Sequence, residues 1–568
     1  MTRFNKTVEV LSLAAGLFGV IQASAATINV PAGRIIAPNL TMTTGNEYIL
    51  QGFCYVLPPD VLTIQPGVVV KGIPGSTTVG ALDYGCLFIC RGAQINANGT
   101  RNQPIIFTSS LDNVNDPTDM PMYGTRATGV PTTIEPNIGR GYWGGVVILG
   151  NAVINSAIDA AGHAAVPKYE VYEGLLDGPD TDPVGGTDGI ISGVNVHRFG
   201  GNNDADNSGT LRYVSIRHGG RNLAANKELN GLSMGGVGSG TTLEFIEVYG
   251  FADDGYEWWG GTVNAKFLVS AFNDDDGFDT DEGFRGKVQF GFNITAKDKR
   301  DDLSEQNGQV NERAAAGELT PVTEYQFRNM TLIGPGEGSG GSGNAVMNIR
   351  VFNRCRWYNS IFSHSSNNRL SINVDSYPVA PSTISATPFA LTGVELHGNI
   401  WWKTTSTDLG PATPANHSPG TFFAAPWIND IVNPLLNGIS YIPDYGLDPT
   451  PATGSPALGG VVTPPADAFY TVTTYKGAFG ANDYWMDGWT YLWERGFLDI
   501  SLNSTYTPAT DTTTVSCRSV TGVTYQFQSS NDGVTWSNTG APIAGTGGTI
   551  STTINPTPTK LIFRVKRG

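Results

Sequence analysis

The feature that most constrains the fold is a repeat of 22 residues in the middle of the chain. Residues 241–260 read TTLEFIEVYGFADDGYEWWG, and residues 263–282 read VNAKFLVSAFNDDDGFDTDE. A third copy begins at Val288 with VQFGFNIT. Short runs of β-forming residues that recur at a fixed period, each followed by Gly and Asp, are typical of a β-solenoid with one coil per repeat.

The same repeat predicts which side chains become neighbours. Coils of a solenoid stack about 4.8 Å apart, so residues 22 positions apart would lie one above the other. Asp254 and Asp276 would share one face of the stack, and Asp253 and Asp275 another, because side chains alternate along a strand. We therefore expect the acidic corners of successive coils to form a column.

The composition also favours β-structure. The chain has 72 Gly and 34 Pro among 568 residues, and 15% of its residues are charged, which favours many short strands and turns over helices. A chain of this length would ordinarily form several domains, but a solenoid grows by adding coils that bury a face on each other. The formal net charge of −16 argues against a nucleic-acid partner, because such a partner needs a positive surface.

The first 25 residues have the pattern of an export signal. Arg3 and Lys6 precede an apolar run over residues 8–21, and Ala23-Ser24-Ala25 follows as a cleavage site. The apolar run is too short for an ordinary transmembrane helix. We expect a secreted or cell-surface protein without a transmembrane segment.

Several motifs carry a resemblance to a known family. They are LTIQPGVVVKG (62–72), RGAQINANGT (91–100), GYWGGVVILGNA (141–152) and DDGYEWWGGTVNAKFLV (253–269). Over about residues 45–300 the chain resembles a group of exported bacterial right-handed parallel β-helix proteins with pectate-lyase-like architecture. The resemblance implies an all-β, right-handed parallel β-helix over residues 26–500. It implies little about activity, because this fold hosts lyases, hydrolases, adhesins and scaffolds.

The stack is expected to be interrupted and capped. Loop excursions are predicted near residues 111–141 and 155–200, where Asp, Pro, Thr and Gly are frequent. Near residues 482–498, aromatic residues recur every fourth position, which predicts a one-sided helix with Asn482 or Asp483 as its N-cap. This helix would close the C-terminal mouth of the solenoid; an aromatic ligand site is the alternative. The aromatic residues are Trp485, Trp489, Trp493 and Phe497.

The C-terminal part has a different pattern. Residues 505–568 alternate polar and apolar positions between NDG and GTGG turns, which predicts a small antiparallel β-sandwich. It would serve either as a sorting or attachment module or as an accessory domain without that role.

The sequence is compatible both with a disulfide among the five cysteines and with free thiols. They are Cys54, Cys86, Cys90, Cys355 and Cys517. Cys86 and Cys90 are too far apart along one strand to bridge each other. Either could meet Cys54 on the neighbouring coil, or the thiols could be buried singly inside the stack.

The acidic column is the candidate metal site. Stacked carboxylates repel unless a proton, a cation or a basic neighbour relieves them, and several of them together offer the oxygen ligands that Ca²⁺ accepts. A hydrogen-bond ladder at the corners, or neutralisation by Arg285 and Lys287, is the alternative. The candidate calcium ligands are Asp254, Glu257, Asp276, Asp279 and Asp281.

The same column and its neighbourhood hold the candidates for catalysis, which are Asp254, Asp276, Asp279 and Arg285. A β-helix polysaccharide lyase uses Ca²⁺ to acidify a proton and an Arg or Lys as base. A glycoside hydrolase needs two carboxyl groups at a fixed separation. The Gly-His-Gly motif of β-helix hydrolases is not found, and His218 in RHGG is the nearest feature.

Two tryptophan pairs, Trp258-Trp259 and Trp401-Trp402, are the candidate ligand-binding residues. Strand alternation would turn one member of each pair outward, where its face could stack on a sugar ring; burial of both is the alternative. We predict a carbohydrate-binding or scaffold protein, adhesin-like, whose partner is a polysaccharide or cell-surface glycan. A calcium-dependent polysaccharide lyase or glycoside hydrolase acting on an acidic polysaccharide is the alternative.

Overall fold

The structure is a computed structural model of the chain. It describes residues 26–30, 36–76, 82–115, 120, 139–155, 169–172, 174–175, 190–224, 227–297, 302–309, 319–336, 346–350, 352–364, 372–375, 394–402, 428–442, 446–498, 502–521, 523–530, 535–554 and 562–567. The signal peptide predicted for residues 1–25 lies outside this part, as does most of the excursion predicted near 111–141.

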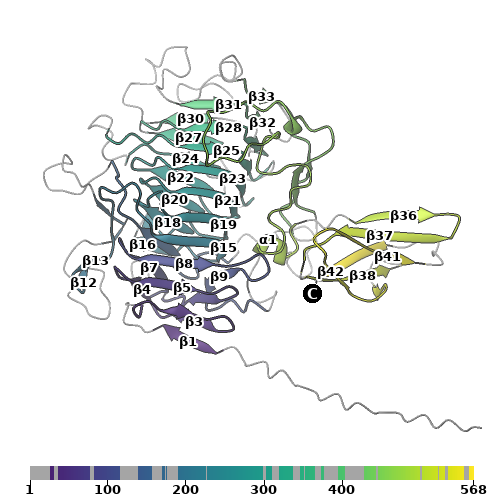
Figure 1. Cartoon of the computed structure of the whole chain (residues 1–568), viewed down its shortest axis with the longest axis horizontal. Helices are drawn as coiled ribbons and strands as arrows, with labels where there is room; N and C mark the ends of the chain where they lie inside the picture. Colours follow the sequence, from purple (N-terminus) through teal and green to yellow (C-terminus); the bar gives the residue numbers. More distant parts are fainter. Residues whose placement is uncertain are drawn as a thin grey trace, which may run out of the picture.

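Two long parallel sheets form the body of the protein (Figure 1). Sheet A has 18 strands: β1 (Thr27–Val30), β2 (Thr41–Met42), β3 (Glu47–Leu50), β5 (Val61–Ile64), β6 (Val69–Gly72), β8 (Gln94–Asn98), β9 (Ile105–Ser109), β15 (Gly209–Arg217), β19 (Thr242–Tyr249), β21 (Asn264–Ala271), β23 (Lys287–Ile294), β25 (Gln326–Arg328), β26 (Thr331–Ile333), β28 (Arg356–Tyr358), β29 (Ile361–Ser363), β31 (Glu395–His397), β32 (Ile400–Trp401) and β33 (Asp430–Ile431). Sheet B has nine: β4 (Phe53–Val56), β7 (Cys86–Ile89), β10 (Val146–Leu149), β18 (Leu232–Gly235), β20 (Tyr256–Trp259), β22 (Phe278–Asp281), β24 (Glu305–Gln306), β27 (Met347–Arg350) and β30 (Ile372–Asp375). The chain alternates between the two sheets coil by coil, which confirms the predicted parallel β-helix.

The 22-residue repeat is one coil of this helix. Leu243 of β19 pairs with Ala265 of β21, and Ala265 pairs with Val288 of β23. On sheet B, Glu257 pairs with Asp279 in the same register. Equivalent residues of the repeats therefore lie one above the other, as the sequence predicts.

Sheet A bends at a ladder of stacked aromatic rings. Tyr213, Phe245, Phe267 and Phe290 occupy equivalent positions, each with a positive φ between 48° and 64°. Successive rings stack with centroids 4.5, 4.3 and 4.9 Å apart. A left-handed backbone is unfavourable for such residues, and ring stacking offsets part of that cost at every coil.

The core between the sheets is filled by the inward side chains of each coil. Leu243, Ile246 and Val248 of β19 meet Tyr256 and Trp258 of β20 in one continuous apolar cluster. All five side chains are buried. Each coil therefore buries its own inner face and the top of the coil below it, which is how a solenoid gains stability.

The cysteines are buried thiols. Cys54, Cys86, Cys90 and Cys355 are free and buried, and Cys517 is buried as well. Cys54 points into the core between the sheets, whereas Cys86 and Cys90 belong to the cluster on the outer face of sheet B. Cys54 and Cys86 therefore lie on opposite faces of the sheet, which excludes a bridge between them.

A C-terminal segment covers the outer face of sheet A. Trp485, Trp489 and Phe497 belong to one buried cluster with Phe272 and Phe292 of the stack. Trp485 meets Phe267 edge-on, with ring centroids 5.4 Å apart. Figure 1 shows this segment, with α1 (Tyr491–Glu494), beside β15 and β19.

The structure therefore differs from the predicted helical cap near 482–498. The segment consists of turns and the four-residue helix α1, whose N-cap is Thr490 rather than Asn482 or Asp483. Gly488, at φ +89°, interrupts a continuous helix. The aromatic residues cover a side of the stack instead of its C-terminal mouth.

The C-terminal module and several small hairpins complete the described residues. The module has antiparallel sheets around a core of Val515, Cys517, Tyr525, Phe527 and Ile550. Its strands are β36 (Asn503–Thr507), β37 (Thr512–Arg518), β38 (Thr524–Ser530), β39 (Ser537–Asn538), β40 (Ile543–Ala544), β41 (Thr549–Ile554) and β42 (Ile562–Arg567). The smaller elements are β11 (Glu170–Val171), β12 (Ile190–Ile191), β13 (Val194–Asn195), β14 (Arg198–Phe199), β16 (Asn222–Ala224), β17 (Lys227–Glu228), β34 (Leu436–Gly438), β35 (Asp448–Pro451) and the 3₁₀ helix η4 (Pro456–Leu458).

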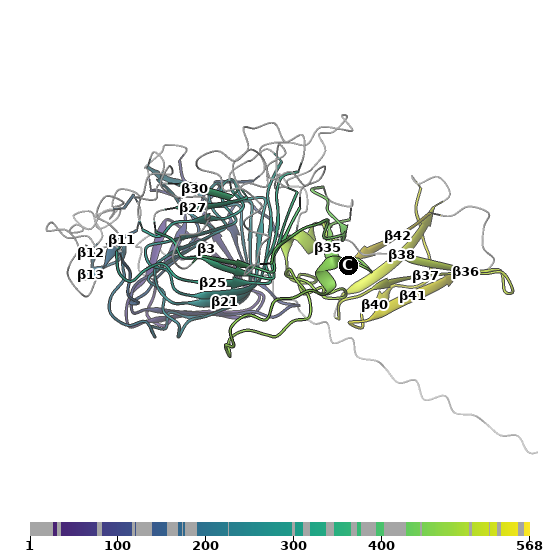
Figure 2. The ribbon, with the colours of Figure 1, turned by 90° about the horizontal axis from the view of Figure 1, so that it is seen from above.

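The hairpins β11–β14 and the C-terminal module lie on opposite sides of the stack (Figure 2). The hairpins are the described part of the excursion predicted near 155–200 and lie on the side of sheet B. In the part of the chain that the structure covers, none of the helices has the length and apolar character needed to span a bilayer.

Candidate functional site

The outer face of sheet B changes character along the stack. The strand register places one outward side chain of each strand from β4 to β27 in a single column. The column reads Tyr55, Phe88, Val147, Ser233, Glu257, Asp279, Glu305 and Asn348. Its residues are mainly apolar in the first coils and acidic in the middle coils, and Asn348 adds an amide beyond them.

The apolar part of this face is covered by the hairpins. Tyr172 and Phe199 pack with Phe88 and Val147 in one buried cluster. The Tyr172 hydroxyl lies 2.9 Å from the Ser233 hydroxyl, at the level where the polar part begins. The acidic coils start directly above this contact.

Three carboxylates converge at the first acidic level. Asp254 ends the corner before β20, Glu257 lies on β20 and Asp279 lies on β22. Each offers an oxygen, and these oxygens all lie within 4.8 Å of one another. The three side chains are only 7, 8 and 6% exposed. We call them the Asp254–Glu257–Asp279 cluster.

The corner beside the cluster is held by a ladder of side chain-to-backbone hydrogen bonds. The Asn230 side-chain oxygen accepts from the Asp254 backbone N–H at 3.2 Å. One coil later, Asp254 Oδ1 accepts from the Asp276 backbone N–H at 2.8 Å. The Asn230 amide also donates to Glu257. The corner ladder predicted as an alternative to a metal is therefore present, and it fixes the positions of two cluster members.

Burial and neighbouring carboxylates disfavour the ionised forms of the cluster. Burial raises the pKa of Asp254 well above its usual value, and Asp253, Asp275 and Asp279 raise it further. Burial, followed by Glu305 and Asp281, likewise raises the pKa of Asp279. Without a cation, these carboxyl groups would be held towards their protonated forms.

The donor set fits Ca²⁺. Asp279 Oδ1 is buried and has no hydrogen-bond partner among the residues that the structure describes, although a buried carboxylate oxygen ordinarily has one. The converging atoms are all carboxylate oxygens, the hard ligands that Ca²⁺ takes in flexible geometry. The charge of Arg350 lowers the pKa of Asp279, but this guanidinium is bound to Glu305 at 2.7 Å.

A second acidic group adjoins the first. Asp253, Asp254 and Asp275 also bring one oxygen each within 4.8 Å of one another, and Asp253 and Asp275 are partly exposed. Asp254 belongs to both groups, so the corners present carboxylates on the buried and on the exposed side of the same turn.

Three other predicted site residues, Asp276, Asp281 and Arg285, are not members of this converging group. Asp276 continues the corner ladder, and burial followed by Asp275 raises its pKa. Asp281 lies two residues beyond Asp279 and pairs with Trp259 in the neighbouring column. Arg285 binds Asp204 at 2.6 Å and the Val153 carbonyl at 2.9 Å. Of the five residues predicted as calcium ligands, the structure brings Asp254, Glu257 and Asp279 together in one converging group.

The comparisons with known proteins identify the fold family. A family model described as a pectate-lyase-like β-helix domain matches residues 33–121 and 113–418. The chain belongs to this family. No curated protein matched the sequence.

Membership of the pectate-lyase-like β-helix family accounts for the stack of coils. The functional site has to be inferred from the individual side chains. Trp258 and Trp401 are buried in the core, and Trp259 is buried under the hairpins, 4.9 Å from the Tyr172 ring. These three rings present no face to a sugar. Trp402 is partly exposed, so the stacking role stays a prediction only there.

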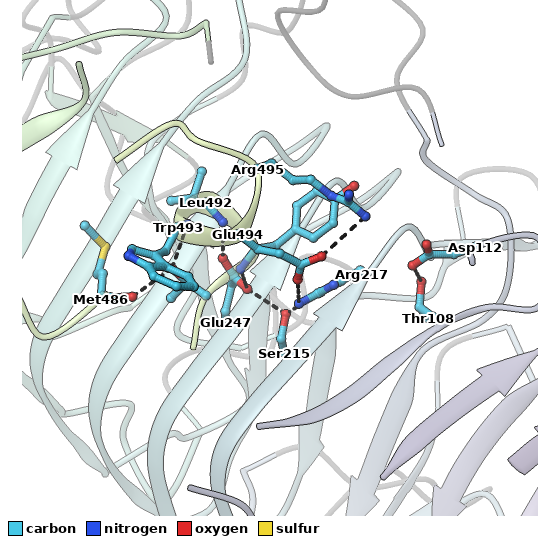
Figure 3. Close-up of polar contacts among 12 residues, drawn as sticks. Thr108, Asp112, Ser215, Arg217, Glu247, Met486, Leu492, Trp493, Glu494 and Arg495 are labelled. Atoms are coloured by element: carbon cyan, nitrogen blue, oxygen red, sulfur yellow. Dashed lines mark hydrogen bonds and ion pairs between the residues drawn. The ribbon is translucent and has the colours of Figure 1, made fainter. Parts of the chain in front are cut away.

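The outer face of sheet A is closed by the chain itself, as Figure 3 shows. Glu247 of β19 is fully buried and accepts hydrogen bonds from the backbone of Tyr491 and Leu492 at 2.6 and 3.2 Å. Arg217 of β15 is buried too and pairs with Glu494 at 2.9 Å. A buried carboxylate thus caps α1 and fixes this segment on the outer face of sheet A.

Sequence reasoning missed two groups beside the cluster. Asn230 lies 24 residues before Asp254 and so falls outside the 22-residue period; only its position before a Gly-rich turn hinted at a corner. Glu305 stacks on Asp279, although 26 residues separate them. An insertion between the coils shifts the period there, and nothing in the sequence pattern marks the new register.

Proposed function

We propose that this member of the pectate-lyase-like β-helix family is an exported scaffold protein whose coils are cross-linked by Ca²⁺ at the Asp254–Glu257–Asp279 cluster. The observation that carries the proposal is that Asp279, whose buried Oδ1 has no hydrogen-bond partner in the described part of the chain, belongs to a triad of converging carboxylates. A cation there would join β20 to β22 and so tie one coil to the next.

Electrostatics supports a cation. Two unit charges 4.8 Å apart at an effective dielectric constant of about 20 repel by about 3.5 kcal/mol. Three ionised carboxylates form three such pairs, while Arg350 is already bound to Glu305. Ca²⁺ removes this repulsion without the near-ideal octahedral geometry that Mg²⁺ requires.

Export is supported by the basic start, apolar run and Ala-Ser-Ala site of residues 1–25. A long stack with a compact core and a C-terminal module suits a role as a rod at the cell surface or in the medium. The millimolar calcium outside cells would keep a site of modest affinity filled.

Calorimetric titration tests the metal proposal. Protein treated with chelator is titrated with CaCl₂, and we expect saturable binding that Asp279→Asn weakens at least tenfold. Asp60→Asn, which removes a carboxylate from a corner outside the cluster, should bind as the wild type does. Equal binding by wild type and Asp279→Asn, or no binding at all, would exclude the cluster as the site.

A calcium-dependent polysaccharide lyase or a glycoside hydrolase is the second candidate. It is favoured by one observation: burial raises the pKa of Asp254 and Asp279, which would hold a carboxyl group in the protonated form that a general acid needs. The predicted base Arg285 is engaged with Asp204. Incubation with acidic and neutral polysaccharides, monitored for unsaturated products and for new reducing ends, tests this candidate; no turnover in either assay would reject it.

A further inference from the structure

A cavity of about 420 Å³ lies where the β-helix meets the C-terminal module. Four parts of the described chain line it: the turn after β8, the segment 482–487, the end of β37 with the residues that follow it, and Gly547 before β41. Figure 1 shows the module beside α1 and the strands of the lower coils. Interfaces between domains are frequent places for small-molecule sites, and volumes of about 300–1,000 Å³ are typical of them.

The floor of the cavity is held in place by an ion pair. Arg518 of β37 donates to Asp487 at 2.9 Å. The same guanidinium lies 3.6 Å from the centroid of the Tyr484 ring. Asp487 is buried, and Asp483 is partly buried beside it. These contacts fix a polar surface across the junction between the two domains.

The rim carries hydrogen-bonding groups that the protein leaves available. The side chains of Arg101, Asn102, Asn482 and Thr521 line the cavity, and each is partly or fully exposed. In the described part of the chain they form no side-chain hydrogen bond. Two amides, a hydroxyl and a guanidinium therefore surround the opening with both donors and acceptors.

The charges around the cavity balance. Arg101 and Arg518 face Asp483 and Asp487, so the lining carries two positive and two negative groups. A phosphate would meet the two carboxylates, and a polyamine would meet the two guanidinium groups. An apolar ligand would leave the amides and the hydroxyl buried without partners, which is unfavourable.

We propose that this inter-domain cavity binds an uncharged saccharide unit. Vicinal hydroxyl groups donate and accept at once, so they match the carboxylate of Asp483, the amides of Asn102 and Asn482 and the guanidinium of Arg101 together. The volume suits one or two sugar rings. This site is separate from the Asp254–Glu257–Asp279 cluster and does not depend on calcium.

Saccharide binding at this cavity requires both domains. The β-helix supplies Arg101 and Asn102, whereas the module supplies Arg518 and Thr521. The module would therefore act as one wall of a glycan site. This role differs from the sorting or attachment role predicted from the sequence, and it uses the full chain.

The test uses the full chain, a blocking variant and a matched control. Asn482→Trp places a large ring at the exposed mouth, and Arg101→Ala removes a rim donor. Asn503→Trp makes the same exchange at an exposed position of β36 on the module, away from the cavity. The probes are cellotriose, maltotriose and mannotriose as uncharged sugars, with trigalacturonate and inorganic phosphate as charged ones, measured by saturation-transfer NMR and calorimetry.

We expect at least one uncharged trisaccharide to bind, with its affinity lowered at least tenfold in Asn482→Trp and severalfold in Arg101→Ala. Asn503→Trp should bind as the wild type does, and chelator should leave binding unchanged. Absence of binding by all three uncharged sugars would overturn the proposal. So would a preference for trigalacturonate or phosphate, or equal binding by Asn482→Trp in a variant with the wild-type melting temperature.

Discussion

Removal of calcium should lower the melting temperature of the protein by a few degrees. A ligand present at about 100 times its dissociation constant stabilises the native state by about 2.7 kcal/mol. The entropy of unfolding is about 2.1 cal/mol/K per residue, so a β-helix of roughly 470 residues changes its stability by about 1 kcal/mol per degree near its melting temperature. We therefore expect a fall of about 3 °C when chelator replaces millimolar CaCl₂.

The assay is differential scanning calorimetry in CaCl₂ and in chelator. Asp279→Asn should melt at nearly the same temperature in both buffers, because it removes the ligand whose Oδ1 has no protein partner. Asp60→Asn should keep the full response of the wild type. A wild-type shift below about 1 °C, or an equal shift in Asp279→Asn, would refute the assignment of the cation to this cluster.

Three further predictions follow from other parts of the structure. Because burial raises the pKa of Asp254 and Asp279, the calcium-free protein should lose stability as the pH rises above about 4, the pKa of these groups in the unfolded chain. Chelator should therefore lower the melting temperature more at neutral pH than at acidic pH. A larger effect at acidic pH would contradict this prediction. Glu247→Ala should destabilise the protein by about 3 kcal/mol and expose the covering segment to protease, because it removes the buried cap of α1. Glu244→Ala is the control on the same strand: this residue is exposed and pairs with Arg212, so its loss should cost at most about 1 kcal/mol. Similar losses of stability in the denaturation curves of the two variants would argue against the cap. The cysteines are buried, and burial raises the pKa of Cys54 to about 12. They should therefore react with a thiol reagent only after unfolding, and rapid labelling of the native protein would contradict their placement.

The stack of coils could be predicted from the sequence because the pattern that specifies it is short and is repeated along the chain. A period of 22 residues between Leu243 and Ala265 is sufficient to place them one above the other. The same period places Glu257 on Asp279. Every residue of the final cluster was a candidate, because each lies in a repeat whose register is fixed by many equivalent neighbours.

The sequence pattern did not predict the contacts that the outward side chains make with segments outside the 22-residue repeat. Trp259 points outward, as alternation requires, but Tyr172 from a distant excursion covers it. The aromatic residues of 482–498 follow a helical spacing, but Gly488 turns the chain there. Their rings then fill the outer face of sheet A, a partner that is nearly half the chain length away in sequence. In both cases tertiary packing determined the exposure of a side chain that local rules left open.

The reduction of the predicted ligand set has a similar cause. Stacking of two adjacent coils predicts that all their carboxylates lie near one another. In the structure, the side chains point in different directions, so only some of the carboxylates converge. Asp276 lies in the corner ladder, above Asp254, and Asp281 faces the neighbouring column. Side-chain direction at a corner depends on local backbone geometry, which the repeat pattern does not specify.

The most direct test of the calcium cross-link is anomalous diffraction from crystals grown with Ca²⁺ and soaked with Tb³⁺, a heavier ion that also prefers oxygen ligands. Our account predicts an anomalous peak between the carboxylates of Asp254, Glu257 and Asp279, bridging β20 and β22. A map with the three carboxylates ordered and no peak among them would contradict it.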